Sequence, residues 1–203
     1  MTFTVRAPEE IAAPSTQGNG INVPQPAAPT PDGYVVEERF VGGTATRFAA
    51  ADQPDDGRWT ATPGEEAEYR TRVIVRRPAS AEDFSGTVIV EWFNVSAIEA
   101  SPDWAFLSDE IVREGHAYVG VSAQAQGVEG GDTLLDVEVD PDQAAASGAS
   151  TDTSGLKNID PDRCGSLVHP GDAYAYDIFA QVGRAASEPT GELLGGFDVT
   201  NVI

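Results

Sequence analysis

The sequence predicts an α/β domain on a mixed sheet that has parallel strands at its centre and flanking helices along its faces. Thr87–Trp92 (TVIVEW) and His116–Ser122 (HAYVGVS) are short apolar runs, which are typical of strands buried on both faces. An amphipathic helix pattern separates them, and a strand–helix–strand unit makes its two strands parallel. With 40% apolar residues, a chain of 203 residues also has enough apolar side chains for one buried core.

The first 33 residues are expected to form an extended, proline-rich arm rather than a packed element. They contain six prolines and few large apolar side chains. Proline fixes φ and removes a backbone donor, so such a stretch does not build a regular helix or a central strand. We therefore expect an arm over residues 1–33 and a folded domain over residues 34–203.

Two strands are expected before the strand–helix–strand unit, at Tyr34–Val41 and Tyr69–Arg77. Both segments are rich in β-branched residues and are bounded by glycine or proline. Tyr69–Val75 alternates in polarity, which suits a sheet with one face more polar than the other. After the unit, Val199–Ile203 (VTNVI) has the composition of a further buried strand.

Helix signals mark two segments. Ser101 is expected to cap the first helix, because Pro102 follows at the first helical position and apolar residues then recur at spacings of three and four. Gly115 is expected to end this helix. Asp172 is expected to cap a second helix, whose apolar stripe consists of Ala175, Ile178, Phe179, Val182 and Ala186.

Residues 127–165 interrupt this pattern and are expected to be an acidic insertion or a lid. The stretch is dense in Gly, Asp, Ser and Thr and shows no periodicity. Four of its acidic residues alternate as the first ligands of a calcium loop do: Asp136, Glu138, Asp140 and Asp142. However, Pro141 and Ser147 stand where such a loop needs Gly and Glu, so a solvated insertion without a metal is the better interpretation.

The charge balance excludes several classes of partner. There are 33 Asp and Glu residues against 12 Lys and Arg, for a formal charge of −21. This acid excess repels phosphate and anionic lipid, so we expect no nucleic-acid partner and no membrane partner. The sequence also lacks a run approaching the roughly 18 consecutive apolar residues of a membrane span.

Few side chains are available for metal or cofactor chemistry. One cysteine excludes an internal disulfide framework and a thiolate zinc site, and two histidines exclude a three-histidine metal centre. The sequence has neither G-x-G-x-x-G nor G-x-x-x-x-G-K, so no cofactor is expected. Met1–Glu10 lacks the basic and apolar regions of a signal peptide, which favours a cytoplasmic location.

The predicted topology places a candidate site at one edge of the sheet. The carboxyl ends of parallel strands and the amino ends of the following helices share that edge, where ligands bind in α/β proteins. The residues expected there are Phe93, Asn94, Val95, Ser96, Gln124, Gln126, His169 and Asp172.

Several segments together resemble the alpha/beta hydrolase domain-containing family, whose members are mostly serine-hydrolase-like proteins. The resemblance runs from roughly Gly33 to Ile203. It is carried by GTVIVEWFNVS (Gly86–Ser96), SPDW (Ser101–Trp104), VSAQ (Val121–Gln124) and SLVHPGDAYAYDIFAQVGRA (Ser166–Ala185).

The resemblance implies a hydrolase sheet in which His116–Ser122 lies between Tyr69–Arg77 and Thr87–Trp92. It also implies a nucleophilic serine in a G-x-S-x-G turn after the strand at Val199–Ile203, followed by the acid and the histidine. No G-x-S-x-G occurs in the sequence, so no catalytic residue is expected within it. We therefore expect the N-terminal half of a partial α/β-hydrolase fold. It would be inactive alone, and the full-length protein would hydrolyse a small ester or related acyl substrate. The alternative is a non-catalytic binding module with half of the fold.

By position, the family's oxyanion loop corresponds to Phe93, Asn94 and Val95. Acyl transfer builds negative charge on a carbonyl oxygen, and preorganised N–H donors stabilise that charge. Asn94 is the preferred residue, because its side-chain amide would add a donor to that of the backbone. The competing interpretation is that Asn94 only caps the turn after the strand.

Both histidines and the cysteine are expected to be structural. In this family the catalytic histidine comes late in the chain, so His169 more simply orders the insertion, with substrate contact as the alternative. His116 begins a strand at the opposite edge of the sheet. Cys164 is close to His169 in sequence, but a thiol–imidazole pair needs an orienting third group that the sequence does not supply.

Overall fold

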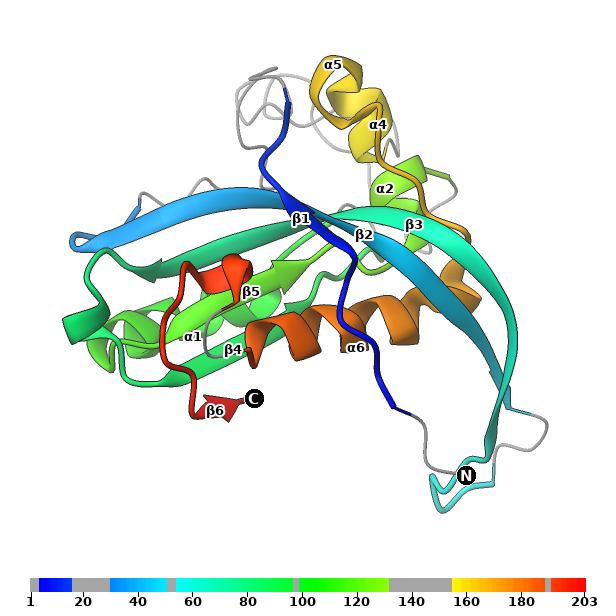
Figure 1. The fold of residues 1–203 in the computed structure, drawn as a ribbon, viewed down its shortest axis with the longest axis horizontal. Helices are drawn as coiled ribbons and strands as arrows, with labels where there is room; N and C mark the ends of the chain where they lie inside the picture. The colour runs from blue at the N-terminus through cyan, green and yellow to red at the C-terminus, as the bar shows by residue number, and fades with distance from the viewer. Residues whose placement is uncertain (1–3, 16–29, 51–53, 97–98, 132–154, 189–190) are drawn as a thin grey trace.

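A mixed sheet of six strands forms the frame of the described part of the chain (Figure 1). The computed structural model describes residues 4–15, 30–50, 54–96, 99–131, 155–188 and 191–203. The strands are β1 (Glu10–Ala12), β2 (Tyr34–Ala50), β3 (Ala61–Pro78), β4 (Thr87–Trp92), β5 (Ala117–Val121) and β6 (Asn201–Val202). Their order across the sheet is β1-β2-β3-β5-β4-β6. β4 is parallel to β5 and β6, and the other neighbours are antiparallel.

The predicted strand–helix–strand unit is confirmed. β4 and β5 pair in parallel, with Val88 opposite Ala117 and Trp92 opposite Val121. α1 (Pro102–Arg113) connects the two strands. β5 lies between β3 and β4, which is the order that the family resemblance implies. The carboxyl ends of β4 and β5 therefore share one edge of the sheet.

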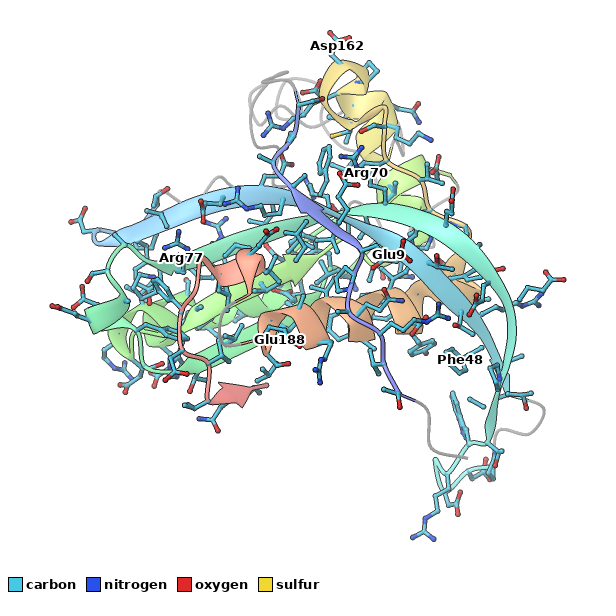
Figure 2. All side chains as sticks on the ribbon, in the orientation of Figure 1. Glu9, Phe48, Arg70, Arg77, Asp162 and Glu188 are labelled. Atoms are coloured by element: carbon cyan, nitrogen blue, oxygen red, sulfur yellow. The ribbon has the colours of Figure 1, made fainter. Side chains whose placement is uncertain are left out.

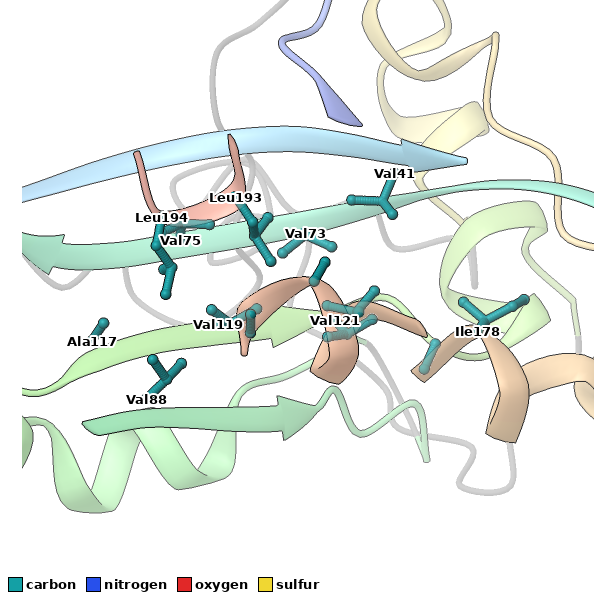
Figure 3. Packing of buried hydrophobic residues seen from close by; sticks show 14 of the residues in the cluster. Val41, Val73, Val75, Val88, Ala117, Val119, Val121, Ile178, Leu193 and Leu194 are labelled. Atoms are coloured by element: carbon teal, nitrogen blue, oxygen red, sulfur yellow. The ribbon is translucent and has the colours of Figure 1, made fainter. Parts of the chain in front are cut away.

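Alternate side chains of the central strands enter two cores on opposite faces of the sheet. Ile74 and Tyr118 pack beneath α1 on one face. Val73 and Val119 point to the other face, which α6 (Ala175–Ala186) covers (Figure 3). Full burial of one such side chain contributes about 1.5–3 kcal/mol. This burial on both faces explains why β5 is apolar throughout and why Val88–Val90 of β4 form a continuous apolar run rather than alternating.

β2 and β3 are much longer than their apolar patterns predict. Their antiparallel pairing runs from Tyr34 opposite Pro78 to Ala50 opposite Ala61, with one register shift near Thr46. The added residues form a long hairpin that extends beyond the helices (Figure 1). Cross-strand hydrogen bonds rather than burial define this part of the hairpin, and most of its side chains are exposed or half-buried. A burial-based pattern cannot predict it for that reason.

The N-terminal arm contains a packed element, which the proline content did not predict. β1 pairs with β2, with Ile11 opposite Val41. Glu9 N–H donates to the Gly42 carbonyl at 2.9 Å, and Arg70 lies 3.1 Å from the Glu10 carboxylate. Figure 2 shows Glu9 and Arg70 where the arm crosses the sheet. The free edge of β2 accepts the arm, because an unpaired edge offers backbone groups to any extended segment.

Short helices complete the described part of the chain. They are η1 (Ala81–Asp83), α2 (Ala125–Glu129), α4 (Leu156–Ile159), α5 (Pro161–Cys164), η2 (Asp172–Tyr174) and η3 (Glu192–Leu194). None of the helices in the described ranges is long and apolar enough to cross a membrane.

The acidic insertion is only partly described, and its described ends are helical. α2 overlaps the start of the segment over 127–165, and α4 and α5 occupy its end. α5 forms because Asp160 accepts the Arg163 N–H (3.1 Å) and Pro161 stands in the first turn. The four acidic residues that resemble a calcium loop lie in 132–154, outside the described residues.

Candidate active site

The loop between β4 and α1 is closed by its own backbone hydrogen bonds. Phe93 N–H donates to the Val121 carbonyl (3.0 Å), which ties the start of the loop to the end of β5. Asn94 and Ala100 exchange two hydrogen bonds, with N···O distances of 2.9 and 2.8 Å. We name residues 93–100 the β4–α1 loop, of which 97–98 lie outside the described ranges. Backbone hydrogen bonds therefore fix the loop at the edge where β4 and β5 end.

Glu91 joins the end of β4 to the beginning of α1. Its buried carboxylate accepts the backbone N–H groups of Asp103 (2.9 Å) and Trp104 (3.1 Å) and the Tyr118 hydroxyl. These N–H groups belong to the first turn of the helix, where an anion is favoured. Ser101 stands at the predicted cap position, but its side chain makes no capping bond. The cap therefore comes from the neighbouring strand, and burial raises the pKa of Glu91.

Two N–H donors of the β4–α1 loop have no acceptor among the described residues. The Asn94 backbone N–H is occupied by the Ala100 carbonyl, so it is not one of them. The Asn94 side-chain oxygen accepts the Ser96 N–H (3.0 Å), which leaves the exposed Asn94 NH₂ group without a partner. The Val95 N–H likewise meets no acceptor in the described ranges. Asn94 thus offers a side-chain donor rather than a backbone donor, and Val95 offers its backbone.

Two further predicted residues, Gln124 and Asp172, form hydrogen bonds at the same edge of the sheet. Trp92 at the end of β4 donates its indole N–H to the Gln124 side-chain oxygen (2.9 Å). Asp172 accepts the Ala125 N–H (2.8 Å) at the start of α2. Asp172 was expected to cap the helix that is α6, but Tyr174 occupies that position, and Asp172 lies in η2 and binds the neighbouring helix α2 instead. This carboxylate lies at the amino end of α2, where it accepts a backbone N–H that has no acceptor within the helix.

His169 orders the end of the insertion. Gly171 N–H donates to its Nδ1 (3.2 Å), so Nδ1 carries no proton, and Nε2–H therefore donates to the Ala123 carbonyl (2.9 Å). Its backbone N–H donates to the Glu129 carboxylate (2.9 Å). Burial lowers the pKa of His169. A neutral imidazole with both nitrogens engaged holds residues 169–171 against the end of β5.

Replacing His169 with glutamine should reduce the amount by which the free energy of unfolding falls when the pH is lowered to mildly acidic values. Because the folded pKa of His169 is lowered, its contribution is fully present above the ordinary value of about 6.5 and is lost as the pH falls through the folded value. The slope from one such group is at most about 1.4 kcal/mol per pH unit. Urea unfolding at pH 7.5 and pH 5.5 should show a smaller loss for His169→Gln than for the unmodified protein. His116→Gln is the control, and equal losses for all three proteins would refute the assignment.

The side chains of Ser96 and Gln126 make none of these contacts. Ser96 donates its backbone N–H to Asn94, and Gln126 gives its carbonyl to the Gly130 N–H (3.0 Å). Neither side chain has a hydrogen-bond partner in the part of the chain that the structure describes. A role for either side chain in binding substrate stays a prediction.

Cys164 is unreactive, and the Ser85–His116 pair lies away from this edge. Burial raises the pKa of Cys164 to about 11, which leaves almost no thiolate at neutral pH. Ser85 Oγ lies 2.7 Å from His116 Nδ1, but this pair is at the amino end of β5. Ser85 Oγ also accepts the Thr87 N–H (3.1 Å), so the pair closes a turn. No group of three His, Cys, Asp or Glu residues within the described ranges is arranged to hold a metal ion.

Sequence reasoning missed two groups of residues at the edge. Trp92 packs against Tyr176 and Phe179 of α6, with ring centroids 5.5 and 5.4 Å apart. Arg72 and Glu99 form a buried ion pair beneath the β4–α1 loop. A signal for Arg72 exists in the sequence, because a charge within the run TRVIV of a central strand is rarely left unpaired.

Comparison with known proteins agrees with this architecture. The sequence matches the alpha/beta hydrolase domain over residues 5–203. Neither a curated protein nor a solved structure matches the chain significantly. The match covers nearly the whole chain, and the mixed sheet with parallel strands and flanking helices is consistent with a hydrolase-like fold. The chain therefore belongs to the alpha/beta hydrolase domain family.

Proposed function

We propose that this chain supplies the sheet and the oxyanion loop of an enzyme that hydrolyses carboxylic esters or related small acyl compounds. The observation that supports the proposal is the pair of unused donors, the Asn94 NH₂ group and the Val95 N–H, on a loop fixed at the end of β4. Acyl transfer develops negative charge on the carbonyl oxygen, and donors that are fixed in advance stabilise it without reorganisation. In this fold, one donor comes from the loop after the corresponding strand.

The nucleophile and the base of this reaction come, in our proposal, from residues other than these 203. The sequence contains no G-x-S-x-G, and the family places its serine after the strand that corresponds to β6. His169 has both ring nitrogens engaged, and His116 lies at the opposite edge. Without a serine and a base to deprotonate it, the oxyanion donors have no charge to stabilise.

Replacing Asn94 with alanine should lower kcat of the hydrolytically active protein by about 10²–10³-fold and change KM little. This is the usual effect of removing one oxyanion donor, because the donor acts on charge that exists only in the transition state. Steady-state kinetics with p-nitrophenyl esters measures both constants. Glu110→Ala, on the exposed surface of α1, is the control and should be nearly silent. If Asn94→Ala leaves kcat within about twofold, the side chain is not the donor.

Labelling by a fluorophosphonate separates the hydrolase from a non-catalytic binding module. In the active protein, peptide mapping should place the labelled serine outside residues 1–203, because no serine within them follows the required elbow turn. Stoichiometric labelling of a serine within residues 1–203 would refute the proposed division of roles. Absence of labelling and of ester hydrolysis in the full-length protein would favour the binding module.

A further inference from the structure

Four charged side chains form a continuous set of contacts beneath the β4–α1 loop. Arg72 of β3 pairs with the Glu99 carboxylate in the loop, and its other terminal nitrogen lies 4.0 Å from Glu38 of β2. Glu38 in turn binds Arg163 of α5. The Arg72 side chain is 0% exposed and that of Glu99 is 6% exposed. We name these four residues the buried ion network. It joins the loop, two strands and the insertion.

Arg72 also holds groups that adjoin the candidate donors. Its Nε donates to Ser122 Oγ (3.2 Å), which directly follows β5. The Phe93 ring, at the start of the loop, lies 5.9 Å from the Arg72 guanidinium carbon. Arg72 lies on a central strand and contacts both ends of the loop, at Phe93 and at Glu99. The loop therefore has a side-chain anchor in addition to its backbone bridge.

Glu99 is enclosed on its other side by α2. A Cβ atom at Gly127 would overlap the Glu99 Oε1 atom and would lie 3.4 Å from a Val95 methyl carbon. Glu99 Oε1 has no hydrogen-bond partner in the described part of the chain. A buried carboxylate with one unsatisfied oxygen is unfavourable by itself, and well-packed apolar residues often serve stability better than a buried ion pair does. The pair is therefore better explained by the position that it imposes than by stability.

We propose that Arg72 and Glu99 are positioning residues that set the place of the Asn94 side chain and the Val95 N–H. The connection is short, because Glu99 directly precedes Ala100, and Ala100 exchanges two hydrogen bonds with Asn94. Movement of Glu99 therefore moves the Asn94 backbone and the donor on its side chain. The catalytic consequence rests on the proposed function of the loop, whereas the effect on the loop itself does not.

The test compares three variants of the protein. Glu99→Gln removes the charge with little change of shape. Glu99→Gln leaves the buried charge of Arg72 without this partner, which can destabilise the protein by itself. Arg72→Met combined with Glu99→Met removes both charges and so avoids that effect. Glu37→Gln is the matched control, because Glu37 pairs with Arg77 across the same two strands (3.0 Å) away from the loop.

Amide hydrogen exchange by NMR gives a readout that does not require catalysis. In both loop variants, the amides of Asn94 and Ala100 should exchange roughly tenfold faster or more, and the Asn94 side-chain NH₂ resonances should shift. Amides of the β4–β5 pairing, such as Val119, should exchange as in the unmodified protein. The Glu37→Gln variant should match the unmodified protein throughout. Unchanged exchange at Asn94 and Ala100 in the double variant would overturn the proposal.

Kinetics of the hydrolytically active protein then separates this proposal from the proposed function. We expect Glu99→Gln to lower kcat by about tenfold or more and to leave KM within about twofold, because a misplaced donor loses transition-state stabilisation. Faster exchange together with lowered kcat supports both proposals. Faster exchange with unchanged kcat, and with Asn94→Ala also silent, supports the positioning of the loop and overturns its oxyanion role.

Discussion

Replacing Glu91 with alanine should destabilise the folded domain by about 3–5 kcal/mol, because it leaves several buried hydrogen-bond donors without an acceptor. The carboxylate is buried and satisfies three donors: two backbone N–H groups of α1 and the Tyr118 hydroxyl. Its removal leaves these donors without an acceptor and takes a negative charge from the amino end of a helix. For a domain of this size, the melting temperature should fall by roughly 10 °C.

Three variants make this expectation specific. Tyr118→Phe removes one of the donors and should cost about 1 kcal/mol. Glu91→Gln keeps one oxygen as an acceptor and should fall between the two. Glu110→Ala, which breaks only an exposed ion pair on the outer face of α1, should change the free energy of unfolding by about 0.5 kcal/mol or less. If urea unfolding shows that Glu91→Ala lowers the free energy of unfolding no more than Glu110→Ala does, then Glu91 is not the cap of α1.

Replacing Gly120 with alanine should destabilise the protein by about 2–3 kcal/mol and displace the start of the β4–α1 loop. A Cβ atom at this position in β5 would overlap the Phe93 ring and would lie 2.8 Å from the Tyr118 hydroxyl oxygen. Phe93 is 2% exposed and cannot move outward without losing its packing. The ring must therefore shift, and the backbone of the loop must shift with it.

A second substitution tests whether the overlap with the Phe93 ring causes the destabilisation. Phe93→Leu in the Gly120→Ala background should recover about 1 kcal/mol relative to the sum of the two single effects, because the smaller side chain makes room for the methyl group. Gly183→Ala is the matched control. A Cβ at Gly183 in α6 meets nothing within 4 Å, so alanine should stabilise the helix by about 0.5–1 kcal/mol. Additive effects of Gly120→Ala and Phe93→Leu would contradict the predicted overlap.

The central unit of the fold was predictable because its signals are local. β4 occupies Thr87–Trp92 as predicted, and β5 is within one residue of its predicted bounds at each end. α1 begins at Pro102 and ends two residues before Gly115, as its spacing and its glycine indicate. Burial on both faces leaves a continuous apolar run in the sequence, and such a run identifies a strand wherever it pairs.

The candidate site was predictable in location but not in chemistry. The carboxyl edge of β4 and β5 follows from the order of elements, and the contacts of Gln124, Asp172 and His169 lie there. The order of elements does not predict that the Asn94 N–H already has an acceptor. That acceptor is the Ala100 carbonyl, six residues away in a loop without periodicity. Asn94 was expected to offer both a backbone and a side-chain donor, whereas the geometry leaves its side-chain NH₂ group and the Val95 N–H.

The sequence by itself determined the elements whose periodicity and capping residues act over a few neighbours: the two apolar strands, the helix between them and the edge at which they end. Only the tertiary structure decided which distant groups satisfy buried charges and unpaired backbone donors. Glu91 rather than Ser101 caps α1, and Arg72 pairs with Glu99, 27 residues away. Such pairings depend on the three-dimensional distance between side chains, and a buried polar group takes whichever partner the packing brings within about 3 Å.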